Sequence, residues 1–164
     1  MIAAGAAPSA ALPRSGAIRG GTHLFLTRVY YEDTDAAGIV YYANYLRFAE
    51  RARTELLRLL GFEQERLRRE AGFAFAVRRC VAEYLMPARL DDELTVTSRL
   101  AALGGATLDV EQRIRRGDAD LVRLDVTLAC VAASGRPVRL PPPLRGALSQ
   151  LLPTSSPVIA NHAR

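Results

Sequence analysis

The sequence contains no lysine and no tryptophan, and it has only two cysteines and two histidines in 164 residues. Without lysine, a Schiff-base nucleophile and the lysine of a P-loop are both excluded. Cys80 and Cys130 lie far apart in the sequence, with no histidine near either, so the spacing of a zinc or redox site is missing. We expect both thiols in the core. His23 and His162 lie near the two ends of the chain, which leaves little material for a histidine-dependent triad or metal site.

Long hydrophobic runs are also missing. No apolar stretch approaches the ~20 residues that a helix needs to cross a bilayer, and residues 1–22 lack the basic start and the Leu or Val block of a secretion signal. We therefore expect a cytoplasmic protein without a membrane span, with residues 1–22 as a flexible tail. With 49% hydrophobic residues, the chain suffices for one domain with its own core and is short for two.

The positive charge is unevenly distributed. All 22 basic residues are arginine and the net charge is +5, yet residues 23–134 hold 16 arginines against 17 acidic residues. The excess belongs to residues 1–22 and 135–164, which contain six arginines and no acid. A duplex-binding domain concentrates positive charge on its folded face, so we do not expect nucleic acid as a partner. A nucleic-acid or scaffold role of the basic tails remains an alternative.

The first half of the chain predicts one strand followed by one long helix. Residues 24–32 are rich in β-branched and aromatic types and predict a strand. From about residue 41 to 60, apolar residues recur with the spacing of one helical face, while charged residues such as Arg53 and Glu55 fill the other face. Gly61 is a suitable stop for this helix. A short charged helix is predicted at about residues 63–71.

The second half predicts four strands in succession, at residues 73–86, 93–103, 107–115 and 121–133, separated by segments with turn chemistry. One strand, one long helix and a run of strands without alternating helices indicate an α+β fold with an antiparallel sheet packed on a single helix. This gives a domain at residues 23–134. The Pro-rich residues 135–164 are predicted to form a tail, in which LRGALSQLL is compatible with a short helix.

Three segments of the sequence are similar to those of a known protein family. RVYYEDTDAAGIVYYANYLRFAERARTELL at residues 28–57, FAFAVRRCVAEYLMPARLDDELTV at 73–96 and EQRI at 111–114 resemble the hotdog-fold acyl-CoA thioesterases of the 4-hydroxybenzoyl-CoA thioesterase type, and most closely the tol-pal-associated acyl-CoA thioesterases. The resemblance spans roughly residues 28–133. It implies a hotdog fold, in which a sheet of about five antiparallel strands wraps around the long helix, subunits pair through their sheets and the active sites lie at the subunit interface.

The resemblance also implies site residues. Asp35, the second aspartate of DTDAAG, is the implied catalytic carboxylate, and an aspartate can act on a thioester either as a base for water or as a nucleophile. The backbone N–H of Tyr42, at the predicted helix start, is the implied donor to the oxyanion. Tyr41 and Asn44 are candidate substrate contacts. Taken without the resemblance, Asp-Thr-Asp before Ala-Ala-Gly is more typical of a solvated turn or a helix cap.

The sequence departs from the family pattern at two places. The tol-pal-associated branch commonly has histidine where this sequence has Tyr42, so a mechanism that needs this histidine is excluded. Relatives often have Arg or Lys in the turn corresponding to residues 103–105, where CoA phosphates can bind, but here the turn is Leu-Gly-Gly. The phosphate contacts must then come from elsewhere, and Arg89 and Arg113 are the candidates.

The resulting expectation is a homodimeric or homotetrameric thioesterase that hydrolyses an acyl-CoA without a metal or other cofactor. Acyl carrier protein is an alternative carrier of the acyl group. A non-catalytic subunit that binds acyl-CoA or acyl carrier protein is the alternative function, and the missing histidine is its support. The length of the acyl chain depends on the depth of a pocket and is not predicted.

Overall fold

The structure is a computed structural model that describes residues 12–154, in which six strands form one antiparallel sheet in the order β1-β2-β4-β5-β6-β3. The strands are β1 (Ala17–Arg19), β2 (Thr22–Arg28), β3 (Phe73–Tyr84), β4 (Glu93–Leu103), β5 (Thr107–Arg116) and β6 (Ala119–Ala132). The helices are α1 (Asn44–Leu59), α2 (Gln64–Arg66) and α3 (Pro142–Ser149), together with the 3-10 turn η1 (Tyr31–Asp33) and the π-helical turn η2 (Leu67–Ala71).

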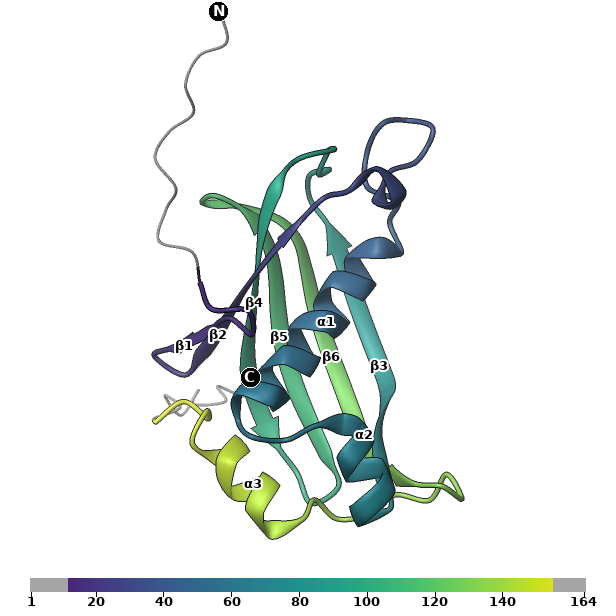
Figure 1. Cartoon of the computed structure of the whole chain (residues 1–164), viewed down its shortest axis with the longest axis vertical. Helices are drawn as coiled ribbons and strands as arrows, with labels where there is room; N and C mark the ends of the chain where they lie inside the picture. The colour runs from purple at the N-terminus through teal and green to yellow at the C-terminus, as the bar shows by residue number, and fades with distance from the viewer. Residues whose placement is uncertain (1–11, 155–164) are drawn as a thin grey trace, which may run out of the picture.

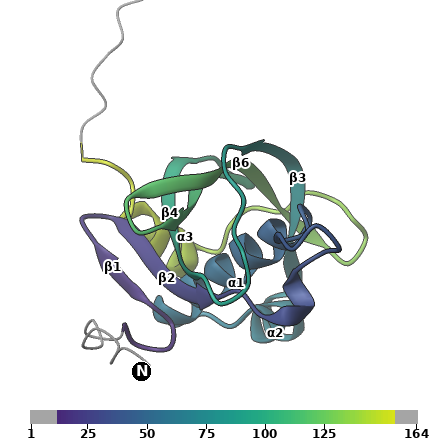
Figure 2. The same cartoon turned by 90° about the horizontal axis from the view of Figure 1, so that it is seen from above.

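The sheet curves around α1, which lies along its concave face (Figures 1 and 2). Alternate residues of the central strands are buried against the helix, because successive side chains of a strand point to opposite faces. On β5 these are Leu108, Val110, Gln112 and Ile114. The intervening residues form a polar outer face. This confirms the predicted α+β hotdog arrangement of one helix wrapped by an antiparallel sheet.

The apolar stripe predicted on α1 forms the centre of the core. Tyr45, Phe48, Ala49 and Ala52 are nearly or fully buried, and Leu56 continues the same face one turn later. These residues recur at the three- and four-residue spacing of a helix side. The helix is thus held mainly by packing on the sheet, which fixes its first turn relative to the strands.

Two elements lie outside the predicted domain boundaries of 23 and 134. The strand β1 and the start of β2 fall within the segment predicted as a flexible tail, and they pair as a hairpin in which Ile18 lies opposite His23. The helix α3 falls within the predicted C-terminal tail, where its Leu144 and Leu148 are buried. The six-stranded sheet therefore has one strand more than predicted. The parts of the predicted tails at residues 1–11 and 155–164, including His162, lie outside the described residues.

Two element ends also differ from the sequence prediction. The first strand was expected to reach residue 32 but ends at Arg28, because the side chain of Asp33 accepts a hydrogen bond from the Tyr30 N–H and turns the chain. The long helix was expected from about residue 41 but begins at Asn44, after a turn at residues 42 and 43. Both differences lie next to DTDAAG.

Within residues 12–154, the strand β3 is an edge strand whose only neighbour is β6. Phe73 is buried at its start, but most of the following residues are exposed, among them Val77, Val81 and Tyr84. Cys80, which was expected in the core, is also exposed because it lies on this edge strand, whereas Cys130 is buried as expected. An unpaired edge with exposed apolar side chains is a ready surface for pairing with another strand.

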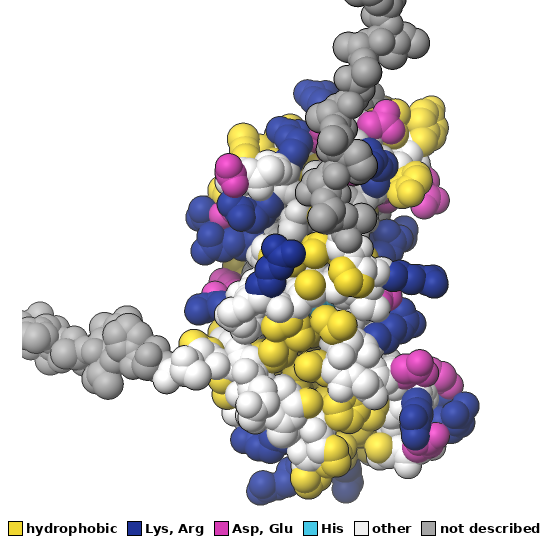
Figure 3. Space-filling view, turned by 60° about the vertical axis from the view of Figure 1, so that its left-hand side comes forward, with side chains coloured by type: hydrophobic (Ala, Val, Ile, Leu, Met, Phe, Trp, Pro, Cys, Tyr) yellow, Lys and Arg dark blue, Asp and Glu magenta, His cyan; other side chains and the backbone are white. Residues whose placement is uncertain are grey.

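The arginines are distributed over the surface. Figure 3 views the side of the molecule that carries β1 and α3, where hydrophobic side chains run along the middle and arginines surround them, with acidic side chains in between. Arg19, Arg136, Arg139 and Arg145, which belong to the predicted tails, are all exposed. No helix within residues 12–154 has the length and hydropathy to cross a membrane.

Candidate active site at the start of the long helix

The turn before DTDAAG is fixed by Asp33. Its carboxylate accepts a hydrogen bond from the Tyr30 N–H at 2.8 Å, and its backbone carbonyl accepts from the Tyr41 N–H and from the Asn44 side-chain amide, both at 2.9 Å. The residue is buried, with 6% of its surface exposed. Asp33 therefore joins the end of β2 to the start of α1 and holds the loop between them.

Asp35 lies on that loop with its carboxylate exposed. The loop is closed by a bridge between Thr34 and Val40, by the Asp35 N–H donating to the Ile39 carbonyl at 2.9 Å, and by the Gly38 N–H donating to the Asp35 carbonyl at 2.9 Å. One carboxylate oxygen, Oδ1, accepts from the Ala37 N–H at 2.8 Å. Residues 12–154 offer no hydrogen bond to Oδ2, so this oxygen is available to water or a substrate.

The turn that leads into α1 presents a free backbone donor. The N-cap residue of the helix, Ala43, has no side chain that could accept from the first N–H groups, and the first turn contains no acidic residue. Within the described chain the N–H of Tyr42 has no acceptor, whereas those of Asn44 and Leu46 donate to the carbonyls of Tyr41 and Ala43. The first N–H groups of a helix lack intrahelical partners and carry the positive end of its dipole. This is the kind of donor that stabilises a developing oxyanion.

Tyr45 ties this helix start to the loop between β3 and β4. Its hydroxyl accepts a hydrogen bond from the Ala88 N–H at 2.8 Å, while the Ala88 carbonyl accepts from the Val40 N–H at 2.9 Å. Burial raises the pKa of the Tyr45 hydroxyl, and the negative charges of Asp92 and Asp35 contribute to the rise. The carboxylate of Asp35 is therefore within electrostatic range of the first turn of α1.

An apolar and aromatic pocket of about 280 Å³ lies at the same end of the helix. Tyr42 and Tyr45 line it from the helix start, and Tyr84 and Met86 line it from the end of β3. The Tyr84 hydroxyl donates to the Tyr42 carbonyl at 3.1 Å, and the Tyr84 ring centre lies 6.2 Å from that of Tyr42. This pocket brings an apolar surface next to the candidate catalytic groups.

The predicted contacts Tyr41 and Asn44 have different surroundings. Tyr41 is exposed, with its ring centre 4.8 Å from that of Tyr42, so its side chain is accessible at the site. The side chain of Asn44 is buried and donates to the Asp33 carbonyl. It therefore positions the turn. The resemblance had made Asn44 a candidate substrate contact, but its amide is used within the protein and is not presented to a substrate.

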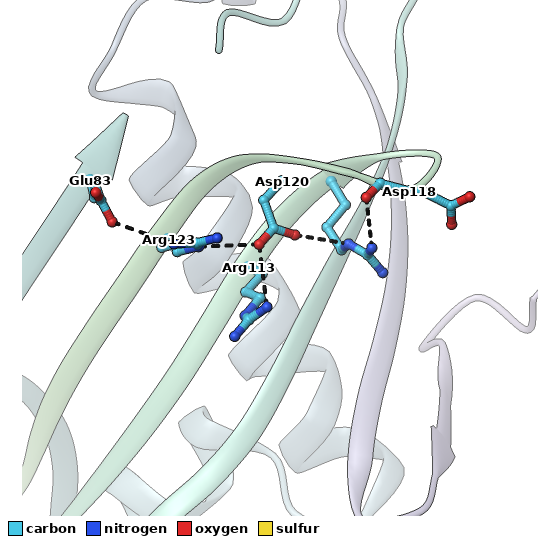
Figure 4. A network of polar contacts seen from close by, with 6 residues as sticks. Glu83, Arg113, Asp118, Asp120 and Arg123 are labelled. Atoms are coloured by element: carbon cyan, nitrogen blue, oxygen red, sulfur yellow. Dashed lines mark hydrogen bonds and ion pairs between the residues drawn. The ribbon is translucent and has the colours of Figure 1, made fainter. Parts of the chain in front are cut away.

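The two predicted phosphate contacts are also separated. Arg89 is exposed in the loop after β3, one residue after Ala88, and thus at the same end of the molecule as Asp35. Arg113 follows the inward-facing Gln112 and lies on the outer face of the sheet. There it pairs with Asp120, at 3.3 Å, in a network that includes Arg123 (Figure 4). Arg89 therefore lies at the same end of the molecule as the candidate site, and Arg113 lies on the outer face of the sheet.

A further arginine lies at the uncharged turn between β4 and β5. The guanidinium of Arg145, on α3, donates a hydrogen bond to the Gly104 carbonyl. Sequence reasoning had assigned Arg145 to the C-terminal tail, and only the packing of α3 brings it to this turn. No group of three or more His, Cys, Asp or Glu side chains gathers within residues 12–154 in a way that could hold a metal ion.

The fold and this site define a hotdog thioesterase, and comparison with known proteins agrees. Residues 29–148 match the model of the thioesterase-like superfamily, and the chain belongs to this family.

Individual relatives are similar over most of their length. An acyl-CoA thioesterase YbgC from Haemophilus influenzae is 44% identical over 128 residues, which cover 77% of this chain and 94% of that protein. An acyl-CoA thioester hydrolase YbgC from Escherichia coli O6:H1 is 47% identical over 105 residues, covering 63% of this chain and 78% of the relative. The crystal structure of a probable thioesterase from Bartonella henselae has a TM-score of 0.70 and 40% identity, covering 73% of this chain and 99% of that chain.

Proposed function

We propose that the protein hydrolyses acyl-CoA thioesters to the free acid and CoA, with Asp35 as the catalytic carboxylate. The observation that carries the proposal is that an exposed aspartate with one oxygen unbonded among residues 12–154 lies on the hydrogen-bonded loop that leads to a helix start without a side-chain cap. Membership of the thioesterase-like superfamily and the names of the YbgC relatives support the same reaction.

In this mechanism the thioester carbonyl oxygen accepts a hydrogen bond from the Tyr42 N–H, which stabilises the negative charge that develops on it. Asp35 then acts in one of two ways. As a base, its Oδ2 takes a proton from the water that attacks the carbonyl carbon. As a nucleophile, it attacks the carbon itself and forms an anhydride that water hydrolyses. In both cases the C–S bond breaks and the thiolate of CoA leaves and is protonated.

Arg89 is the proposed contact for the CoA phosphates at the candidate site. It is exposed and directly follows Ala88, whose carbonyl accepts a hydrogen bond from Val40 at the end of the Asp35 loop. Arg145 is a second proposed contact, since it supplies a positive charge at the Leu-Gly-Gly turn that has none of its own. Arginine suits this role because its planar guanidinium binds phosphate oxygens in pairs.

This assignment predicts different effects on substrates with and without the nucleotide. The Arg89→Gln and Arg145→Gln variants should each raise KM for an acyl-CoA several-fold, while KM for the matching acyl-pantetheine, which lacks the nucleotide phosphates, stays unchanged. Steady-state kinetics on the two substrates measure this. An equal rise for both substrates would contradict the assignment of that arginine.

We also propose that two copies pair through β3. The strand is twelve residues long, has one free edge and exposes Val77, Val81 and Tyr84. Antiparallel pairing of two such edges about a two-fold axis would join two sheets into one. The aromatic pocket at the Tyr84 end of β3 would then lie beside the partner subunit. A further pairing of dimers into a tetramer is compatible with this arrangement.

The proposed compartment is the cytoplasm. Both cysteines are free, as is usual in a reducing compartment.

The experiment that tests the function is thioester cleavage by the purified protein with a panel of acyl-CoAs of different chain length and shape. Hydrolysis with turnover supports an enzyme, whereas saturable binding without release of CoA would identify the alternative, a non-catalytic acyl-CoA binding subunit. The same panel carried on acyl carrier protein separates the two carriers by kcat/KM.

A further inference from the structure

A second pocket lies near the far end of α1, away from Asp35. It has a volume of about 110 Å³ and is lined by residues of α1, α2, the sheet and α3. The apolar part of its lining comes from Leu56, Phe75, Leu108, Val110, Leu128 and Leu148. The volume is below the roughly 150 Å³ of a cavity that accepts benzene. The pocket therefore fits a short apolar segment and not a long chain.

One wall of this pocket carries a guanidinium that is fixed in place. Arg53 Nη1 donates to Gln112 Oε1 at 2.6 Å. Gln112 is 1% exposed, and its Nε2 donates to the Ala49 carbonyl and to Ser98 Oγ, both at 2.9 Å. These two donated bonds determine which way the amide faces, so its oxygen must point to Arg53. The network holds the guanidinium in one position before any ligand arrives.

The charge of Arg53 is not neutralised by a bonded carboxylate. No acidic side chain of residues 12–154 comes within ion-pairing distance of it, and its hydrogen-bond partner is a neutral amide. Burial lowers the pKa of the Arg53 guanidinium, and the negative charge of Glu50 only partly opposes this. A guanidinium has five N–H donors. Arg53 is partly buried, and removing a cation from water costs free energy unless an anion accompanies it. An anionic ligand would supply the missing partner.

We propose that this pocket receives the far end of acyl groups that end in a carboxylate, and that Arg53 is the residue that selects them. The inference rests on the proposed function, since it places the thioester at the Tyr42 N–H. Arg53 follows Asn44 by nine residues, or about 14 Å along the helix at 1.5 Å per residue. The acyl chain therefore spans about that distance between the thioester and its terminal carboxylate.

The route between the two pockets follows β3. Val77 lines the pocket beside Arg53, and Tyr84 of the same strand lines the aromatic pocket beside the helix start. Cys80, between them on β3, is exposed. The strand thus connects the candidate catalytic end with the arginine pocket along one side of α1.

Glu50 also lines the pocket and carries the opposite charge. Its side chain is exposed and accepts a hydrogen bond from Thr54 Oγ1 at 2.6 Å, so water screens its effect on a bound carboxylate. Because a carboxylate in the pocket would still be repelled slightly, Glu50→Gln should strengthen the selection that Arg53→Gln weakens. The two variants therefore change the preference for a terminal carboxylate in opposite directions.

The kinetic test uses CoA thioesters in pairs of equal chain length, one ending in a methyl group and one in a carboxylate. At the length that spans to Arg53, the wild type should prefer the carboxylate by about tenfold to a hundredfold in kcat/KM. Arg53→Gln, which can still donate to Gln112, should abolish this preference, and Arg53→Lys should retain part of it. Arg51→Gln removes an exposed arginine of the same helix and should change neither member of a pair.

A binding measurement separates this inference from the proposed reaction. Calorimetry with free dicarboxylates and with monocarboxylates of equal length should show binding of the dicarboxylate to the wild type that is lost in Arg53→Gln. Absence of hydrolysis for every acyl-CoA would overturn the proposed function. The calorimetry would then decide whether Arg53 binds a carboxylate. Hydrolysis without any preference for the carboxylate, or a preference that survives Arg53→Gln, would overturn the inference and leave the thioesterase intact.

Discussion

Glu32, Asp33 and Asp35 lie within four positions of one another and have different surroundings. Glu32 is exposed in a single 3-10 turn, Asp33 is buried and closes that turn, and Asp35 is exposed with one oxygen unpaired. The resemblance had singled out Asp35 as the candidate catalytic carboxylate. It could not predict that Asp33 also accepts hydrogen bonds from the start of α1, because those contacts depend on where the helix begins.

His23 is a buried titratable side chain of the sheet, with 1% of its surface exposed. Its Nε2 lies 2.8 Å from the Ser15 carbonyl, which can only accept, so Nε2 carries the proton of the neutral ring. Its Nδ1 is buried without a partner among the described residues. Burial lowers the pKa of His23 below its ordinary value of 6.5, although the Ser15 carbonyl and the charge of Glu55 oppose the shift.

This environment predicts that the protein loses stability on mild acidification. The unfolded chain binds a proton at His23 more readily than the folded chain, so the free energy of unfolding is full above about pH 6.5 and falls as the pH drops below it. Urea unfolding at pH 7.5, 6.5 and 5.5 measures the decline. The His23→Gln variant cannot titrate and should show a flatter dependence over this range. An equally steep decline in that variant would assign the effect to other groups.

Helices and strands that have a local sequence pattern were predicted from the sequence. Those that form only through contacts with distant residues were not. The stripe on α1 and the four later strands follow from periodicity, and their bounds in the structure lie close to the predicted ones. The short strand β1 has only three residues and gains its stability from pairing with β2. Arg53 was predicted on the charged side of α1, and only its contact with Gln112 reveals that it is partly buried.

The helix α3 is the clearest case of an element that the sequence assigned to a tail. Leu148 is 2% exposed and lies against the pocket beside Arg53. Replacing it with alanine removes buried methyl groups and leaves a cavity, so Leu148→Ala should lower the free energy of unfolding by about 2–5 kcal/mol.

The neighbouring Ser149 is exposed, and Ser149→Ala should change stability by less than about 0.5 kcal/mol. Urea unfolding of both variants tests whether α3 belongs to the folded domain. A Leu148→Ala variant as stable as the wild type would restrict the domain to the residues that the sequence had predicted.

At the scale of the whole molecule, the free edge of β3 is the feature that a single chain leaves open. Val81 is 44% exposed on this strand, opposite Asp125 in the register with β6. An arginine at position 81 costs little in the single chain, but in two paired edges it would lie beside a second β3, whose Arg78 and Arg79 carry the same charge and repel it. The Val81→Arg variant should therefore be monomeric in light scattering at concentrations where the wild type is at least dimeric, with an unchanged circular dichroism spectrum.

Thr97, which is half-buried on the central strand β4, offers a control because it lies away from that edge. A Thr97→Ser variant should keep the oligomeric state of the wild type. If Val81→Arg assembles as the wild type does, the subunits associate through another surface.

The central claim is that Asp35 carries out the chemistry, and single-turnover hydrolysis of an acyl-CoA tests it most directly. Asp35→Asn keeps an oxygen that can accept from the Ala37 N–H, so the loop should remain intact while the carboxylate is lost. Glu32→Gln removes an exposed carboxylate three residues earlier and serves as the matched control. We predict that Asp35→Asn lowers the rate by about 10²–10⁴-fold while Glu32→Gln remains close to the wild type. A folded Asp35→Asn variant that hydrolyses the substrate at the wild-type rate would contradict the account.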